Sequence, residues 1–142
     1  MVPYMTLATA DASGQPWNSP LFTAHDEHYN FYWTSPARAH HSQNILTNNK
    51  IFLVIFSSQA IEGASEGVYI KARGQLVEDS NETQQALKLL AQRAGKSAEA
   101  MNQLFDGDGL RVYKAVPEQF WINITQEVGG KFIDERVEIK LI

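Results

Sequence analysis

About eight segments of this chain have the residue pattern of β-strands, and turn residues separate most of them. The segments are rich in β-branched and aromatic residues, and Gly, Pro, Asn, Asp and Ser cluster between them. They span residues 4–10, 16–24, 29–34, 50–57, 68–78, 110–116, 118–125 and 131–141. A chain with this many short strands must build its core mainly from sheet.

Two of these segments differ in pattern and therefore in expected burial. Residues 68–78 alternate, which predicts a strand with one buried and one polar face. Lys71 and Arg73 lie on the polar face, where we expect surface or interface positions. Residues 50–57 form a continuous apolar run, which predicts a strand that is buried on both faces.

Helix signals interrupt the strands in two regions of the chain. Ser35 and Pro36 suit the N-cap and first position of a helix over 36–47. Asp79 and Glu82 match a capping box that opens a second helix, which Gly95 ends. A further helix follows over 97–104, and then a sharp turn over 105–109. Because helices and strands do not alternate regularly, we predict a mainly β fold, an antiparallel β-barrel with peripheral α-helices, in one domain spanning 1–142.

Composition excludes several classes of protein. The net charge of −4 argues against nucleic-acid binding, which normally requires a basic face. With no cysteine, the chain has no disulfide framework and no thiolate ligand for a metal. The first ten residues lack the basic and apolar regions of a signal peptide, and the longest apolar run, 51–56, is too short to span a membrane. We therefore expect a cytoplasmic protein that contacts neither membrane nor nucleic acid.

A segment without acidic residues surrounds the first predicted helix. No Asp or Glu occurs over 28–61, where an even spread of the 16 acidic residues over 142 positions would place about four. Within this segment lie Arg38, His40 and His41, beside several hydroxyl groups. Cations and free backbone N–H groups at a helix start suit an anion, and a phosphate better than a carboxylate. The alternative is that Arg38 is simply exposed and the gap is chance.

Other groups have two interpretations. Tyr32 and Trp33 precede the basic segment and offer a flat surface for a ring system. His25 and His28 have the spacing of a metal pair, but no further ligands are evident, and a solvated turn is the simpler interpretation, so we expect no metal. Trp121 suits a core or interface position better than a catalytic one.

The order of several segments resembles a known family. In chain order they read LATADASGQPWNSPLF, YNFYWTSPARAHHSQNI, NNKIFLVIF, GVYIKARGQLVED and VYKAVPEQFWI. Together they resemble the pyridoxamine 5′-phosphate oxidase-like family of FMN-binding split β-barrels, and within it the small general-stress-protein type. The resemblance runs from Thr6 to about Lys140. It implies a homodimer with FMN at the subunit interface.

The resemblance also implies which residues hold FMN. The end of one strand and the segment after it would bind the phosphate and ribityl chain, a second strand would run along the flavin ring, and an aromatic and a basic residue would approach from later in the chain. By position these residues are Asn18, Ser19, Pro20, Leu21, Trp33, Thr34, Ser35, Arg38, His41, Ser42, Trp121 and Lys131.

Four departures from the family pattern limit the function that the resemblance implies. Ala39 stands where the oxidases usually have the second residue of a basic pair, with His40 or His41 as the substitute, and Gly67 stands where a Gln is frequent. The Arg-Leu-His-x-Arg pattern that grips the vitamin phosphate is absent. The chain also begins almost at its first strand, which we expect to leave one barrel end more open. We therefore expect an FMN-dependent oxidoreductase acting on a small substrate; the alternatives are a flavin-binding or storage protein without turnover, or a split barrel that binds haem, a deazaflavin or nothing.

Overall fold

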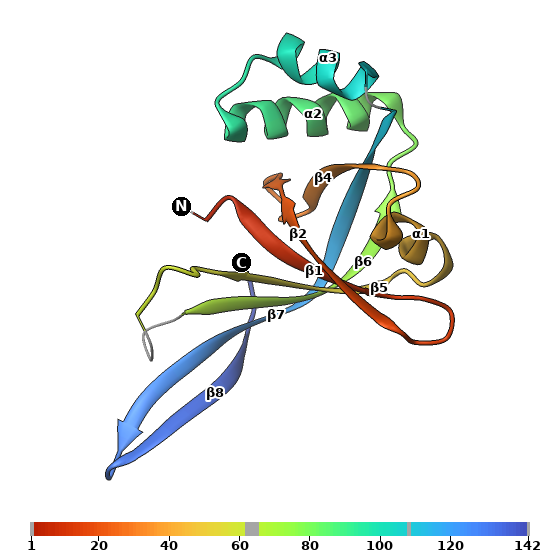
Figure 1. Ribbon diagram of the computed structural model, residues 1–142. Helices are drawn as coiled ribbons and strands as arrows, with labels where there is room; N and C mark the ends of the chain where they lie inside the picture. Colours follow the sequence, from red (N-terminus) through yellow and green to blue (C-terminus); the bar gives the residue numbers. More distant parts are fainter. Residues whose placement is uncertain (1, 62–65, 108, 142) are drawn as a thin grey trace.

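The computed structural model describes residues 2–61, 66–107 and 109–141, and its strands form one antiparallel sheet (Figure 1). The strand order is β2-β1-β5-β6-β7-β4-β3, and β8 pairs with β7. The elements are β1 (Tyr4–Ala10), β2 (Pro16–Phe22), β3 (Ala24–His25), β4 (Phe31–Pro36), α1 (His40–Thr47), β5 (Lys50–Phe56), β6 (Gly67–Leu76), α2 (Ser80–Ala94), α3 (Ala98–Gly107), β7 (Leu110–Val128) and β8 (Lys131–Ile139). This confirms the predicted mainly β, antiparallel fold with peripheral helices.

The helices lie outside the sheet at two separate places. Helices α2 and α3 pack on each other at the top of the view in Figure 1, and α1 contacts β1, β2 and β6 at the right. The β7–β8 hairpin extends away from the body of the molecule. The larger hydrophobic cluster lies inside the curved sheet and includes Leu7, Trp33, Leu53 and Ile70. A smaller cluster, around Leu87, lies where α2 covers β4 and β7.

Glycine at position 74 allows α1 to sit close to the sheet. A Cβ atom at Gly74 would lie 3.2 Å from Ile45 of α1 and 3.1 Å from Ile51 of β5, closer than most real Cβ contacts. The Gly74 N–H also donates to the Asn49 carbonyl at 2.8 Å. A larger residue at this position would push α1, and the site built around it, away from β6.

Two predicted strands are one strand in the structure. Residues 110–116 and 118–125 both belong to β7, which continues through Pro117. A shift in the β6–β7 register at this point leaves Glu118 without a paired residue in β6. A bulge of this kind tolerates proline, because the missing N–H interrupts no regular ladder bond. The predicted strand break was therefore wrong.

Burial of β5 also differs from the prediction. Ile51 and Leu53 are buried, but Phe52 and Phe56 are exposed to 36% and 41%. Strand β5 therefore has one buried and one exposed apolar face, not two buried faces.

The first helix begins later than the pattern predicted. Pro36 is the last residue of β4, where it pairs with Leu110, and α1 begins at His40 with Ala39 as its N-cap. A residue before proline favours extended backbone, so Ser35 stays in the strand and does not cap the helix. Helix α3 ends later than predicted, at Gly107, so the turn predicted over 105–109 is helical in its first part. Residue 108 lies outside the described residues.

Candidate functional site

The turn between β4 and α1 places Arg38 at the surface. The Ala39 N–H donates to the Pro36 carbonyl at 3.0 Å, and the Gln43 side chain donates to the Ala37 carbonyl at 2.6 Å. These bonds fold the turn tightly against the start of α1. Among the described residues, no carboxylate lies within ion-pair distance of the exposed Arg38 guanidinium.

His41 joins this turn to two strands of the sheet. Its Nε2 lies 2.8 Å from the Ser35 hydroxyl of β4, and its Nδ1 lies 3.3 Å from the Ser19 hydroxyl of β2. The Trp17 indole N–H donates to the Ser19 hydroxyl at 3.1 Å. Because the indole can only donate, the Ser19 hydroxyl accepts from it. The tautomer of His41 decides which ring nitrogen donates to its serine and which accepts from it.

Burial makes this imidazole a neutral group. His41 is 9% exposed, and its burial, with a smaller contribution from the nearby His40, lowers its pKa below the ordinary value. His41 is therefore a hydrogen-bonding link rather than a charge at neutral pH. If His41 contacts an anion, as expected, it does so as a neutral imidazole. The positive charge at the surface of this turn comes from Arg38.

Further polar groups lie around α1. The Trp17 and His40 rings stack at 4.2 Å between centroids with an interplanar angle of 11°. The buried Asn44 side chain donates to the Thr9 hydroxyl at 3.0 Å. The Ser42 hydroxyl is fully buried and has no hydrogen-bond partner among the described residues. This last group is a donor for which the described part of the chain supplies no acceptor.

Strand β2 presents the predicted flavin-contact residues on two different faces. Asn18 and Pro20 are exposed, whereas Ser19 and Leu21 are partly buried toward α1 and the core. In the described sheet β2 pairs only with β1, so its other backbone edge is open. An edge strand can offer its N–H and C=O groups to a ligand, as expected for residues 18–21.

The aromatic residues just before the turn are in the core. Trp33 is 1% exposed and packs in the larger cluster, and Tyr32 is 5% exposed in the smaller one. The Tyr32 hydroxyl lies 3.1 Å from the Glu82 carboxylate and 3.3 Å from that of Asp26. The prediction that these two rings offer a flat surface was wrong, because both side chains point into the protein. Thr34, between Trp33 and Ser35, is partly exposed.

The sheet places a second exposed cation at the end of β4. Arg111 of β7 is the register partner of Ser35, and it is exposed. Arg111 was not predicted from the sequence, because 76 positions separate it from Ser35 and nothing in the local pattern marks it. It is a candidate for the second basic residue that Ala39 fails to supply.

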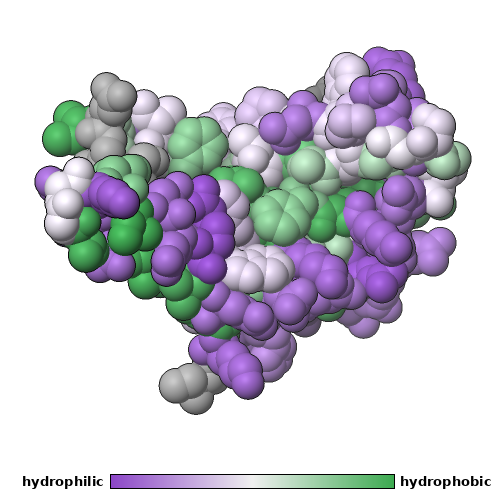
Figure 2. Space-filling model, turned by 90° about the horizontal axis from the view of Figure 1, so that it is seen from below, coloured by the Kyte–Doolittle hydropathy of each residue, from purple (hydrophilic) through white to green (hydrophobic). Residues whose placement is uncertain are grey.

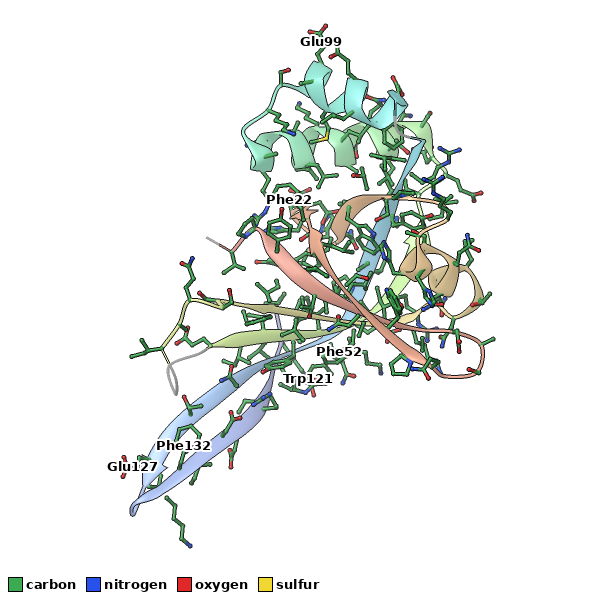
Figure 3. The ribbon with its side chains drawn as sticks, in the orientation of Figure 1. Phe22, Phe52, Glu99, Trp121, Glu127 and Phe132 are labelled. Carbon is green, nitrogen blue, oxygen red and sulfur yellow. The ribbon has the colours of Figure 1, made fainter. Side chains whose placement is uncertain are left out.

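A second group of residues lies on the outer face of the sheet. Asn18 pairs with Ala8, which pairs with Phe52, so these residues share one face. The Phe52 ring stacks against Trp121 at 6.1 Å between centroids, and Figure 3 shows the two side chains together beneath the sheet. Figure 2 shows apolar side chains on this face, seen from below. Nearby, the Arg136 guanidinium lies 4.4 Å from the centre of the Tyr69 ring.

Lys131 is far from α1 within one chain. It begins β8 at the tip of the β7–β8 hairpin, next to Phe132, which Figure 3 labels at the end of the hairpin. Within one chain the structure thus gathers Ser19, Ser35, Arg38, His41 and Ser42 around α1. Asn18 and Trp121 share the outer face, and Lys131 joins neither group.

The described residues contain no cluster of three or more His, Asp or Glu side chains that could hold a metal. His28 instead lies 3.7 Å from the Glu27 carboxylate in an exposed turn. In the part of the chain that the structure describes, no helix has the length and apolar character needed to cross a bilayer.

The antiparallel sheet with its peripheral helices is the arrangement of the split β-barrel class of proteins. A family model described as pyridoxamine 5′-phosphate oxidase matches residues 2–123, and the chain belongs to this family. Comparison with curated protein sequences gives no match.

Solved structures share the fold at low sequence identity. HutZ, the heme storage protein from Vibrio cholerae, is 22% identical with a TM-score of 0.72, and the match covers 84% of each chain. A heme binding protein from Mycobacterium smegmatis is 17% identical with a TM-score of 0.70, covering 95% of this chain and 53% of that one. Campylobacter jejuni ChuZ is 14% identical with a TM-score of 0.72, covering 94% and 54%. At these identities the likeness establishes the fold.

Proposed function

We propose that residues 1–142 form a flavoprotein domain that holds FMN and acts as an oxidoreductase on a small substrate. The observation that carries this proposal is that Arg38 is exposed and has no ion-pair partner among the described residues, in a chain of this family. Its turn leads directly into α1, where His41 contacts two serine hydroxyls. Arg38 would bind the phosphate by charge-assisted hydrogen bonds, with Arg111 as a second cation. Bound FMN would supply the redox chemistry, for which the protein provides position and electrostatics.

The donor set fits a phosphate with a polyhydroxyl chain. The first turn of α1 carries no acidic residue, so nothing there repels an anion. Ser35 and Thr34 supply hydroxyl groups at the end of β4, and the buried Ser42 hydroxyl lacks a partner among the described residues. The open edge of β2 would provide backbone groups to the polar edge of the flavin.

The rest of the site is proposed to come from a second subunit. A homodimer that joins the outer faces of two sheets would cover Phe52 and Trp121, and would bring Trp121 and Lys131 of one subunit toward the FMN site of the other. We also propose that the dimer works in the cytoplasm. Since the Arg-Leu-His-x-Arg pattern is missing, the substrate is proposed to be a small molecule other than pyridoxamine phosphate.

One observation favours a second candidate function, haem binding. Two of the structural neighbours are described as a heme storage protein and a heme binding protein. A flavin-binding protein without turnover is the further alternative to an oxidoreductase.

Titrations with FMN and with haemin test these proposals. We expect FMN to bind, with the flavin absorbance bands retained on the protein, and Arg38→Ala to weaken binding by about tenfold to a hundredfold. Arg73→Ala is the matched control, because Arg73 is an exposed arginine that already pairs with Glu118 at 2.7 Å. Equal FMN affinity in wild type and Arg38→Ala would contradict the assignment, and tight haemin binding without FMN binding would favour the second candidate. Bleaching of bound flavin by NAD(P)H would separate turnover from storage.

A further inference from the structure

A pocket of about 470 Å³ lies at the end of the barrel near the C-terminal end of α2. This volume is within the range of about 300–1,000 Å³ for small-molecule sites. Apolar side chains of β1, β4, β5, β6, β7 and β8 form most of its wall, and Asp and Glu are absent from the described lining. The polar side chains in the lining include His25 and Arg93. The pocket is therefore an apolar chamber with basic groups and no described acid.

Arg93 has no counter-charge in the part of the chain that the structure describes. Its Nη2 donates to the Val2 carbonyl at 2.7 Å, but its buried Nε–H has no hydrogen-bond partner among the described residues. No described carboxylate forms an ion pair with it. A guanidinium that is partly removed from water and bonded to a neutral carbonyl is under-compensated, and an anion would stabilise it.

The end of α2 does not supply the missing acceptor. A cation in the last turn of a helix is favourable because the final carbonyl groups carry partial negative charge. Here the Ala91 carbonyl accepts from the Lys96 N–H at 2.9 Å, and the Gln92 carbonyl accepts from the Gly95 N–H at 3.2 Å. The end of a helix is therefore a favourable place for Arg93, but its Nε–H has no acceptor among the residues that the structure describes.

Arg93 and His25 also line a second pocket, of about 380 Å³, with Ala24, Leu89 and Gln92. The guanidinium consequently lies where the apolar chamber meets a more polar surface beside α2. A ligand with one anionic end and one apolar end would match both sides of this boundary.

We infer that this pocket binds a small amphiphile with an apolar tail and a single carboxylate. The tail occupies the chamber lined by residues such as Ile70, Phe120 and Ile139, and the carboxylate pairs with the Arg93 guanidinium. The pocket is lined by none of the residues gathered around α1, so this site is separate from the proposed FMN site.

Calorimetric titration with octanoate and 1-octanol tests the inference, because the two probes share a tail and differ in charge. We expect octanoate to bind the wild type at least about tenfold more tightly than octanol. Arg93→Gln should abolish this preference, whereas Lys88→Gln, which removes an exposed charge from the same helix, should keep it. Val68→Phe narrows the chamber and should weaken both probes, which tests the pocket with Arg93 intact.

Several results would overturn the proposal. These are binding of neither probe, equal affinity for octanol and octanoate in the wild type, or an equal loss of octanoate affinity in Lys88→Gln and Arg93→Gln. Saturating FMN should leave octanoate affinity unchanged, and displacement of octanoate by FMN would place the probe in the cofactor site instead.

Discussion

At the scale of single residues, His41 holds the candidate site together. It is the only described side chain that bonds both Ser19 of β2 and Ser35 of β4, and it does so from α1. Burial lowers its pKa, so the folded chain resists protonation of this imidazole. In the unfolded chain the same group titrates near its ordinary value of 6.5. As pH falls below that value, the unfolded state gains a proton first, and the folded state loses relative stability.

We therefore predict that His41→Gln reduces the acid sensitivity of the fold. Glutamine keeps a donor and an acceptor but cannot be protonated. Between pH 7 and about pH 5 the free energy of unfolding should fall less in His41→Gln than in the wild type, measured by urea unfolding at each pH. His28→Gln is the control, since His28 is exposed in a turn and should keep the wild-type slope. An unchanged slope in His41→Gln would contradict the role given to this imidazole.

At the scale of elements, helices α1 and α2 have first turns that are stabilised in different ways. Helix α2 has Asp79 as N-cap, and its side chain accepts from the Glu82 N–H at 2.7 Å. The Glu82 side chain does not complete the capping box but pairs with Lys114 of β7 at 2.6 Å. Helix α1 begins at Ala39 without a side-chain cap, so tertiary contacts hold its first turn.

Asp79→Ala should destabilise the protein by about 1 kcal/mol, because it leaves an N–H of the first turn of α2 without its acceptor. For a chain of 142 residues this corresponds to a lower melting temperature by about 3–5 °C in a thermal unfolding scan. Ser80→Ala is the control, because Ser80 is exposed and its hydroxyl forms no hydrogen bond with the residues that the structure describes. A melting temperature of Asp79→Ala equal to that of Ser80→Ala would show that the cap contributes nothing.

At the scale of the whole molecule, the outer face of the sheet exposes large aromatic side chains to solvent. Phe52 of β5 and Phe132 of β8 are exposed to 36% and 66%, and the strand register places both on this face. Ile124, Val128 and Val137 are also exposed, but the same register places them on the opposite face of β7 and β8. Apolar patches of this kind commonly mark protein interfaces. The face is continuous with Trp121 through its contact with Phe52.

We predict a homodimer through this face, with twice the 15.9 kDa chain mass in light scattering at micromolar concentration. Phe52→Glu should shift the protein to monomer, because it would bury a carboxylate in the interface without a partner. Leu104→Glu, on the exposed surface of α3, should leave the dimer intact. A monomer mass for the wild type, or a dimer that survives Phe52→Glu unchanged, would contradict this arrangement.

Local sequence patterns were enough to predict the features that depend on neighbours along the chain. The alternation over residues 68–76, the Asp79 cap and the left-handed Gly95 at the end of α2 each follow from local backbone and side-chain preferences. Asn18, Ser19, Ser35, Arg38, His41 and Ser42 were proposed as site residues from their positions in a family pattern. The pattern could not say which of their side chains point at each other.

Tertiary structure decided the features that depend on strand register and on packing between distant segments. Pairing of β6 with β7 carried one strand through Pro117, and pairing of β4 with β7 placed Arg111 across from Ser35. Core packing turned Trp33 inward, and the Phe52–Trp121 contact formed across the sheet. Local patterns extend over a few residues, whereas these contacts join residues separated by tens of positions, so only the folded sheet fixes which of them meet.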